Sequence, residues 1–133
     1  MTNRELLDAA RSGMANSYSP YSDFKVGAAV LVDDGTVYTG CNIENASLGA
    51  TICAERTAMV KAVSEGHRHF QKVAIVSSGN FFTYPCGICR QFMVEFMKDG
   101  VVVLEDKDEG IREFTLEELL PGGFTNDDLK TQK

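Results

Sequence analysis

The sequence lacks an excess of basic residues, a long hydrophobic run, an internal repeat and any low-complexity stretch. Its 133 residues include 13 Lys and Arg against 19 Asp and Glu, which gives a formal net charge of -6 at pH 7. A nucleic-acid-binding protein needs basic side chains to displace counterions from the phosphates, so this balance argues against DNA or RNA as a partner. A small uncharged substrate suits the composition better than a polyanion.

No hydrophobic run approaches the length of a membrane-spanning helix, and no apolar segment of the signal-peptide kind follows Met1. We therefore expect a cytoplasmic protein with no membrane partner. In a reducing compartment, the four cysteines are expected to bind metal or to carry redox chemistry rather than to form disulfides. The length and a hydrophobic content of 44% fit a single domain over residues 1–133.

Hydrophobic periodicity predicts helices alternating with strands. Helices are predicted to begin near Thr2, Cys53 and Cys86, and strands to cover residues 25–32, 36–39, 72–77, 101–104 and 111–115. The tail from Leu116 is expected to hold one short helix followed by irregular chain. This alternation predicts a layered α/β fold.

Two short motifs, each at the start of a predicted helix, carry the chemistry. The first is Cys53-Ala54-Glu55, and the second is Pro85-Cys86-Gly87-Ile88-Cys89. Three thiols and one carboxylate at these spacings fit the cysteine-ligated version of the zinc deaminase signature. Catalytic zinc sites use three protein ligands and keep one position for water, so Cys53, Cys86 and Cys89 are the predicted ligands.

The charged residues beside the first motif have predicted roles of their own. Glu55 is expected to take the proton from the attacking water and to pass it to a ring nitrogen and the departing amine. Zinc with three thiolates is formally -1, which would raise the pKa of its water. We expect hydrogen bonds to sulfur from the helix N-termini and from Arg56, with Arg90 as a second candidate, to offset this charge.

The residues alone leave other interpretations of these patterns open. Cys86-x-x-Cys89 at a helix start also fits a thioredoxin-like redox pair, although this leaves the first motif unexplained. A structural zinc with Cys41 as a fourth ligand fits the total of four thiols, although a cysteine at a strand end is more commonly a small buried hydrophobic residue. His67 and His69 are interpreted as solvated loop histidines rather than a second metal site.

The chain resembles the small, homotetrameric cytidine deaminases of nucleoside salvage, and the resemblance runs nearly from end to end. The matching segments are Tyr18-Ser19-Pro20-Tyr21-Ser22, Phe24-Lys25-Val26-Gly27-Ala28-Ala29, Gly40-Cys41-Asn42-Ile43-Glu44-Asn45-Ala46, Cys53-Ala54-Glu55-Arg56-Thr57-Ala58, Pro85-Cys86-Gly87-Ile88-Cys89-Arg90-Gln91 and Glu118-Leu119-Leu120-Pro121. The zinc motif is shared across deaminases, whereas the Phe-x-Val-Gly-Ala and Asn-x-Glu-Asn segments narrow the resemblance to enzymes of free nucleosides.

The resemblance implies a three-layer α/β/α fold with a mixed sheet of about five strands and one Zn²⁺ per subunit. It implies hydrolysis of cytidine and deoxycytidine to uridine and deoxyuridine plus ammonia, by attack of zinc-bound hydroxide at C4 with Glu55 as the proton shuttle. The alternatives are a deaminase of a related cytosine-bearing nucleoside and a catalytically silent zinc-binding interaction protein.

The resemblance also implies roles for residues outside the zinc motif. Phe24 is expected to pack on the pyrimidine, Asn42 and Glu44 to hydrogen-bond the ribose hydroxyls, and the backbone of Ala54 to contact the base. Phe124 is expected to reach a neighbour's pocket in a homotetramer with shared active sites. Without the resemblance, Asn42 and Glu44 could also be ordinary polar loop residues that cap the next helix. Phe24 could equally be a core residue.

The chain departs from the family pattern at Leu48-Gly49, where Tyr-Pro is expected. The lost aromatic ring changes the expected detail of the subunit interface and of the pocket edge, but it leaves the chemistry unchanged.

Overall fold

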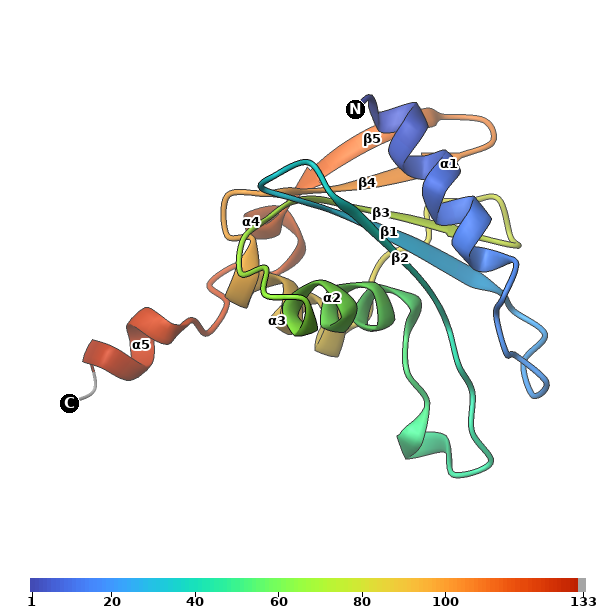
Figure 1. Ribbon diagram of the computed structural model, residues 1–133, viewed down its shortest axis with the longest axis horizontal. Coiled ribbons are helices and arrows are strands. Elements are labelled where there is room, and N and C mark those ends of the chain that lie inside the picture. The colour runs from blue at the N-terminus through green and yellow to red at the C-terminus, as the bar shows by residue number, and fades with distance from the viewer. Residues whose placement is uncertain (132–133) are drawn as a thin grey trace.

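The computed structural model describes residues 1–131 and arranges them in three layers (Figure 1). A five-stranded sheet with the order β2-β1-β3-β4-β5 is the central layer. Helix α1 (Asn3–Met14) covers one face, and α2 (Ala54–Ser64) and α3 (Gly87–Phe96) cover the other. The α/β/α layering and the number of strands agree with the prediction.

The sheet is mixed because one pair of neighbouring strands is parallel. The strands are β1 (Val26–Val32), β2 (Val37–Cys41), β3 (Phe70–Ser77), β4 (Val101–Asp106) and β5 (Gly110–Thr115). Strands β3 and β4 are parallel and connected through α3, whereas the other neighbours pair antiparallel. The consecutive antiparallel pairs β1–β2 and β4–β5 join through short turns, whereas the parallel pair β3–β4 requires a crossover, and this crossover carries the second cysteine motif.

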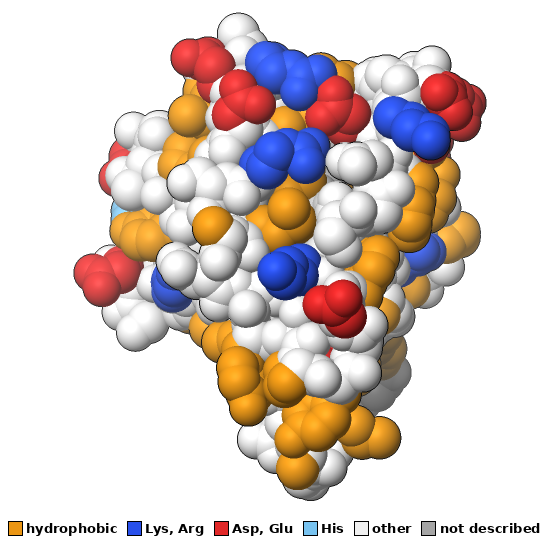
Figure 2. Space-filling view, turned by 90° about the vertical axis from the view of Figure 1, so that its right-hand side faces the viewer, with side chains coloured by type: hydrophobic (Ala, Val, Ile, Leu, Met, Phe, Trp, Pro, Cys, Tyr) orange, Lys and Arg blue, Asp and Glu red, His pale blue; other side chains and the backbone are white. Residues whose placement is uncertain are grey.

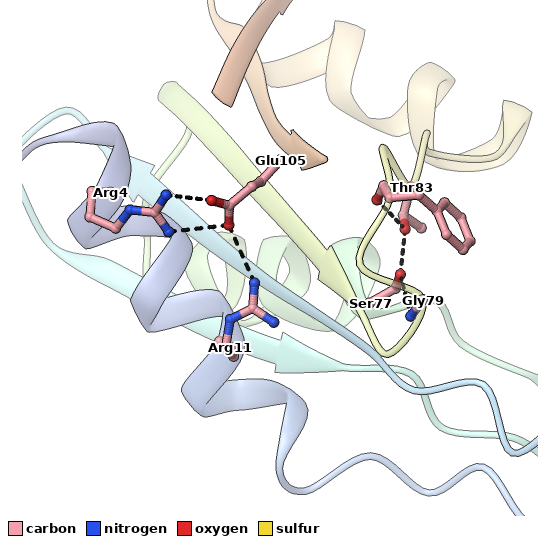
Figure 3. A network of polar contacts seen from close by, with 7 residues as sticks. Arg4, Arg11, Ser77, Gly79, Thr83 and Glu105 are labelled. Atoms are coloured by element: carbon pink, nitrogen blue, oxygen red, sulfur yellow. Dashed lines mark hydrogen bonds and ion pairs between the residues drawn. The ribbon is translucent and has the colours of Figure 1, made fainter. Parts of the chain in front are cut away.

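The central strands are buried on both faces, which explains their continuous apolar sequences. Along β1, Ala28 and Val30 pack toward α2 and α3, whereas Ala29 and Leu31 pack toward α1. Helix α1 is held against its face by Leu6, Leu7 and Ala10 and by ionic contacts from Arg4 and Arg11 to Glu105 on β4 (Figure 3). The sheet is therefore a rigid support for the segments that follow its strands.

Some element boundaries differ from the prediction. Strand β3 begins at Phe70 instead of 72, and β4 continues to Asp106 instead of 104. The tail was expected to hold one helix but holds two, α4 (Leu116–Leu119) and α5 (Asn126–Thr131). Helix α5 was missed because its residues are mostly polar and show no apolar stripe.

A single 3-10 turn, η1 (Leu48–Ala50), lies in the loop between β2 and α2, which protrudes from the body of the molecule (Figure 1). No helix in the described part of the chain is both long and apolar enough to cross a membrane.

Candidate metal centre

Three cysteine sulfurs meet where α2 and α3 begin. Cys53 is the N-cap of α2, Cys86 is the N-cap of α3, and Cys89 lies in the first turn of α3. Their Sγ atoms all lie within 4.8 Å of one another, and those of Cys53 and Cys86 are 3.8 Å apart. Two sulfurs that each lie ~2.3 Å from a tetrahedral zinc are ~3.8 Å apart, so this spacing fits zinc ligation. It is far too long for a disulfide, and all four cysteines are free.

The backbone around these sulfurs favours their charged form. Neither Cys53 nor Cys86 makes a side-chain capping bond, so the first N–H groups of both helices are left without such a partner. These N–H groups and the positive end of each helix dipole stabilise a thiolate. The two helix starts therefore supply both the ligands and part of the compensation for their charge.

Hydrogen bonds within the cluster shift the pKa values of Cys53 and Cys89 in opposite directions. A hydrogen bond with Cys89 and another from Arg56 lower the pKa of Cys53 to about 5. The bond with Cys53, together with burial, raises the pKa of Cys89. The sulfurs thus share protons that a bound cation would displace, as expected for ligands that must be deprotonated to bind metal.

Arg56 lies against the cluster as predicted. Its Nη2 is 3.5 Å from the sulfur of Cys53, and its buried Nε–H has no hydrogen-bond partner within residues 1–131. Arg90, the second candidate, instead donates hydrogen bonds from its guanidinium to the carbonyls of Pro85 and Leu119, each at 2.7 Å. These bonds connect the start of α3 to α4.

No fourth protein ligand joins the three sulfurs among residues 1–131. Cys41 is the last residue of β2, where it pairs with Gly27, and it is not part of the sulfur cluster. The arrangement therefore favours a site with an open coordination position over a structural Cys₄ site. Among residues 1–131, neither His67 nor His69 belongs to a group of side chains that could bind a metal ion.

Glu55 is buried beside the cluster in the first turn of α2. Its side chain is only 5% exposed. Burial, and next the charge of Cys53, raise its pKa to about 7. A carboxyl group with a pKa near neutrality can both accept and donate a proton under ordinary conditions, which is what a general acid–base requires.

A cavity of about 200 Å³ opens onto these groups. It is lined by Val26, Asn42, Thr51, Cys53, Ala54, Glu55, Thr83, Tyr84 and Cys86. Five of these residues were predicted site residues. Four were missed: Val26, at the start of β1, and Thr51, Thr83 and Tyr84, whose only signal in the sequence is their position just before the two cysteine motifs. A larger cavity of about 710 Å³ around the C-terminal end of α3 shares no lining residue with this one.

Asn42 lines the cavity, but most of the hydrogen-bonding capacity of its side-chain amide is taken up by bonds within the protein. Its Nδ2 donates to the carbonyl of Phe24 at 2.8 Å, and its Oδ1 accepts from the backbone of Val26 at 3.0 Å and from the hydroxyl of Ser17. One Nδ2 hydrogen remains for a ligand. Asn42 therefore also fixes the Phe24 segment beside the pocket.

Glu44 lies on an adjoining cavity of about 230 Å³, which shares Thr51 with the first. Its carboxylate accepts from the backbone N–H groups of Tyr21 and Ser22 at 2.9 and 3.1 Å and from the Ser22 hydroxyl. The hydroxyl bond, and then these N–H groups, lower the pKa of Glu44. Leu48, where the chain departs from the expected pattern, also lines this second cavity.

Two other predicted residues lie outside the lining of the first cavity. Phe24 is half-buried and stacks on Phe81, with ring centroids 6.0 Å apart. Phe124 is 49% exposed, and its carbonyl accepts a hydrogen bond from Gln91 of α3 at 2.7 Å. Within one chain, Phe124 lines neither cavity.

Comparisons with known proteins agree with this geometry. Residues 1–105 match the family model described as the cytidine and deoxycytidylate deaminase zinc-binding region. The chain is similar to the cytidine deaminase of Halalkalibacterium halodurans, with 47% identity over 97% of this chain and 98% of that protein. It is also 45% identical to the cytidine deaminase of Sporosarcina psychrophila, over 97% of this chain and 96% of that one.

The fold has solved counterparts as well. The crystal structure of cytidine deaminase from Burkholderia pseudomallei superposes with a TM-score of 0.87 and 42% identity, covering 93% of this chain and 100% of that chain. The structure from Mycobacterium tuberculosis gives a TM-score of 0.83 and 38% identity, covering 93% and 98%.

Proposed function

This chain belongs to the cytidine and deoxycytidylate deaminase zinc-binding family, and we propose that it hydrolyses cytidine and deoxycytidine to uridine and deoxyuridine with release of ammonia. The observation that carries the proposal is the cluster of three sulfurs beside a buried carboxyl group, with Cys53, Cys86 and Glu55 lining one small cavity and Cys89 buried behind it. The cavity has room for one small planar ring and is not lined by basic side chains.

Cys53, Cys86 and Cys89 hold the Zn²⁺ ion. When bound there, zinc is a Lewis acid that makes water a nucleophile at neutral pH. Arg56 and the two helix N-termini offset the negative charge of three thiolates, which would otherwise weaken that effect. Exchange of Arg56 for Gln is expected to lower both zinc affinity and turnover.

Glu55 moves the protons of the reaction. Its carboxylate removes a proton from the attacking water as the oxygen bonds to C4, and gives it to N3 of the ring. A second proton then passes through the same carboxyl group to the amine as the bond between C4 and nitrogen breaks, and ammonia leaves. The pKa of about 7 allows Glu55 to act in both directions without a large cost in either.

The rest of the cavity orients the nucleoside. The Ala54 backbone contacts the base, and Phe24, which lies just outside the cavity lining and is held by Asn42 and by its stack on Phe81, packs on the pyrimidine. Asn42 has one amide hydrogen left for a ribose hydroxyl, and Glu44 accepts hydrogen bonds from the sugar at the adjoining cavity. These contacts distinguish a nucleoside from free cytosine.

The assembly is proposed to be a homotetramer in the cytoplasm, with Phe124 completing a neighbour's site. Apolar side chains gather at the lower end of the face shown in Figure 2. Leu48 is 75% exposed, Ile88 on α3 is 63% exposed, and Phe124 is exposed as well. The gathering of apolar side chains on this one face, more than any single exposed residue, supports an interface between subunits.

The direct test is to incubate the purified, zinc-loaded protein with cytidine and to follow the loss of absorbance of the amino-pyrimidine. Steady turnover with equimolar release of ammonia is expected. Zinc-loaded protein that leaves cytidine unchanged would favour a silent zinc-binding protein. Activity on cytosine or dCMP without activity on cytidine would remove the ribose contacts assigned to Asn42 and Glu44.

A further inference from the structure

The loop between β3 and α3 builds one wall of the substrate cavity. Thr83 and Tyr84 line the cavity, and the next two residues are Pro85 and the zinc ligand Cys86. The loop contains no helix or strand of its own, so side-chain contacts must fix its path. What holds Thr83 therefore also determines the shape of the cavity.

Ser77, the last residue of β3, provides such a contact from beneath the loop. Its side chain is 2% exposed, and its Oγ accepts a hydrogen bond from the Thr83 hydroxyl at 2.6 Å (Figure 3). The same oxygen accepts the backbone N–H of Gly79 at 3.2 Å. A buried hydroxyl without hydrogen-bond partners is costly. The Oγ of Ser77 finds two such partners, both of them donors from the loop.

The geometry of the turn agrees with this attachment. Asn80 has a φ of +55°, and a Cβ on Gly79 would lie 2.0 Å from the ring of Phe81. The chain therefore reverses tightly over Ser77 and returns Thr83 to it. Ser77 is also the β-sheet partner of Val26, a further lining residue of the cavity.

The neighbouring loop residues are held by aromatic contacts as well as by hydrogen bonds, among them the backbone bond of Phe82 to Asp106. Phe82 and Tyr84 pack edge-on against Phe114 of β5, with ring centroids 5.9 and 5.3 Å apart. These contacts fix the side of the loop that faces β5. The Thr83 hydroxyl lies 3.2 Å from the carbonyl oxygen of Phe81 within the loop, and its shorter bond to Ser77 ties the cavity wall to the end of β3.

We propose that Ser77 is a positioning residue for substrate binding, acting through Thr83 to hold the cavity wall in place without touching the substrate. This inference rests on the proposed nucleoside deaminase function. The zinc ligands are fixed by the starts of α2 and α3, so the loss of this hydrogen bond should alter substrate binding more than zinc binding.

The test compares Ser77→Ala, Thr83→Val and the double variant with wild-type protein. Each single change removes one partner, and Thr83→Val keeps the size and β-branching of the side chain. We expect KM for cytidine to rise roughly 2- to 10-fold in each, the range set by one hydrogen bond. The KM increases should combine less than multiplicatively in the double variant, because both changes remove the same Ser77–Thr83 bond, while each also removes one weaker bond within the loop. kcat should change less, and zinc content should remain at one ion per chain.

Controls separate this role from general destabilisation. Ser64→Ala at the end of α2 and Thr36→Val in the β1–β2 turn repeat the same chemical changes at exposed positions, and both should leave KM unchanged. Thr83→Ser keeps the hydroxyl and should lie closer to wild type than Thr83→Val. Hydrogen exchange should accelerate in the peptide 78–86 in both single variants and not in β1 or α1.

An unchanged KM in both single variants would overturn the proposal, as would KM increases that multiply in the double variant. A Thr83→Ser variant as impaired as Thr83→Val would assign the effect to the methyl group instead. If the wild-type protein proved inactive on cytidine, the proposed function would fail, and hydrogen exchange would still decide whether Ser77 holds the loop.

Discussion

Gly40 allows α2 to lie close against the sheet, and replacing it with alanine tests how strictly the site depends on that contact. A Cβ at this position on β2 would lie 2.5 Å from the nitrogen of Ala58, 2.6 Å from the carbonyl oxygen of Ala54 and 2.9 Å from the Cβ of Thr57. The nitrogen and oxygen are donor and acceptor positions of one helical turn. The methyl group would thus press on the turn that holds Glu55.

The magnitude follows from these distances. Ordinary contact begins at 3.4 Å, so the first turn of α2 must retreat by about 0.9 Å, and backbone atoms cannot rotate away as a side-chain end would. Overpacking of this kind costs ~1–3 kcal/mol of unfolding free energy. A misplacement of ~1 Å in a catalytic group lowers the rate by as much as ~10²-fold. We expect Gly40→Ala to show both losses.

The assay pairs urea denaturation with kcat measured on zinc-saturated protein. Gly49→Ala is the matched control, because a Cβ there meets no atom within 4 Å and the residue has no positive φ. This control should keep wild-type stability or gain a fraction of a kcal/mol. If Gly40→Ala matched wild type in both stability and turnover, the contact between β2 and α2 would not be what positions the site.

Three further predictions concern single side chains. Glu55→Gln should keep its zinc and its fold but lose at least ~10²-fold in kcat, and brisk turnover would mean that another group moves the proton. Cys86→Ala should lose both zinc and activity, because two thiols bind zinc poorly, and metal analysis that finds it fully loaded would remove Cys86 from the ligands. Glu105→Gln should cost ~1 kcal/mol of unfolding free energy at pH 7, since Arg4 and then Arg11 hold the pKa of this carboxyl below its ordinary value. That contribution is present above the unfolded-state pKa of ~4.3 and is lost as pH falls through the lower folded-state value, so the stabilities should converge below pH ~4, and a gap that persisted there would point to packing instead.

The metal centre was predictable from the sequence because its chemistry is local. Cys86 and Cys89 share one helical turn, and Cys53 and Glu55 share another, so spacing alone indicates ligands and a nearby carboxylate. The sequence also signalled the layered fold, since strands buried on both faces produce long apolar runs. That Cys41 stays out of the cluster depends on strand pairing, which the spacing of cysteines does not encode.

Contacts between distant segments were not predictable in the same way. The amide of Asn42 bonds the Phe24 segment, and the hydroxyl of Ser77 holds Thr83, yet nothing in the local sequence distinguishes either from an ordinary polar residue. Their roles follow from burial, because a polar group removed from water must find a partner among whatever packs beside it. Only the assembled sheet determines which partner that is.

The zinc ligands and the residues that shape the substrate cavity lie in different segments, so substitutions can change substrate binding without changing metal binding. Cys53 and Cys86 cap helices whose positions are set by packing against the sheet, whereas Thr51, Thr83 and Tyr84 belong to the loops just before those caps. A substitution within either loop can therefore reshape the cavity without moving the start of a helix, because the helix is held by its packing against the sheet and not by the loop. The departure from the family pattern at Leu48-Gly49 falls in the first of these loops and outside both helices. Changes in nucleoside preference are therefore expected to arise in residues 42–52 and 78–84, while the sulfur ligands and Glu55 stay fixed.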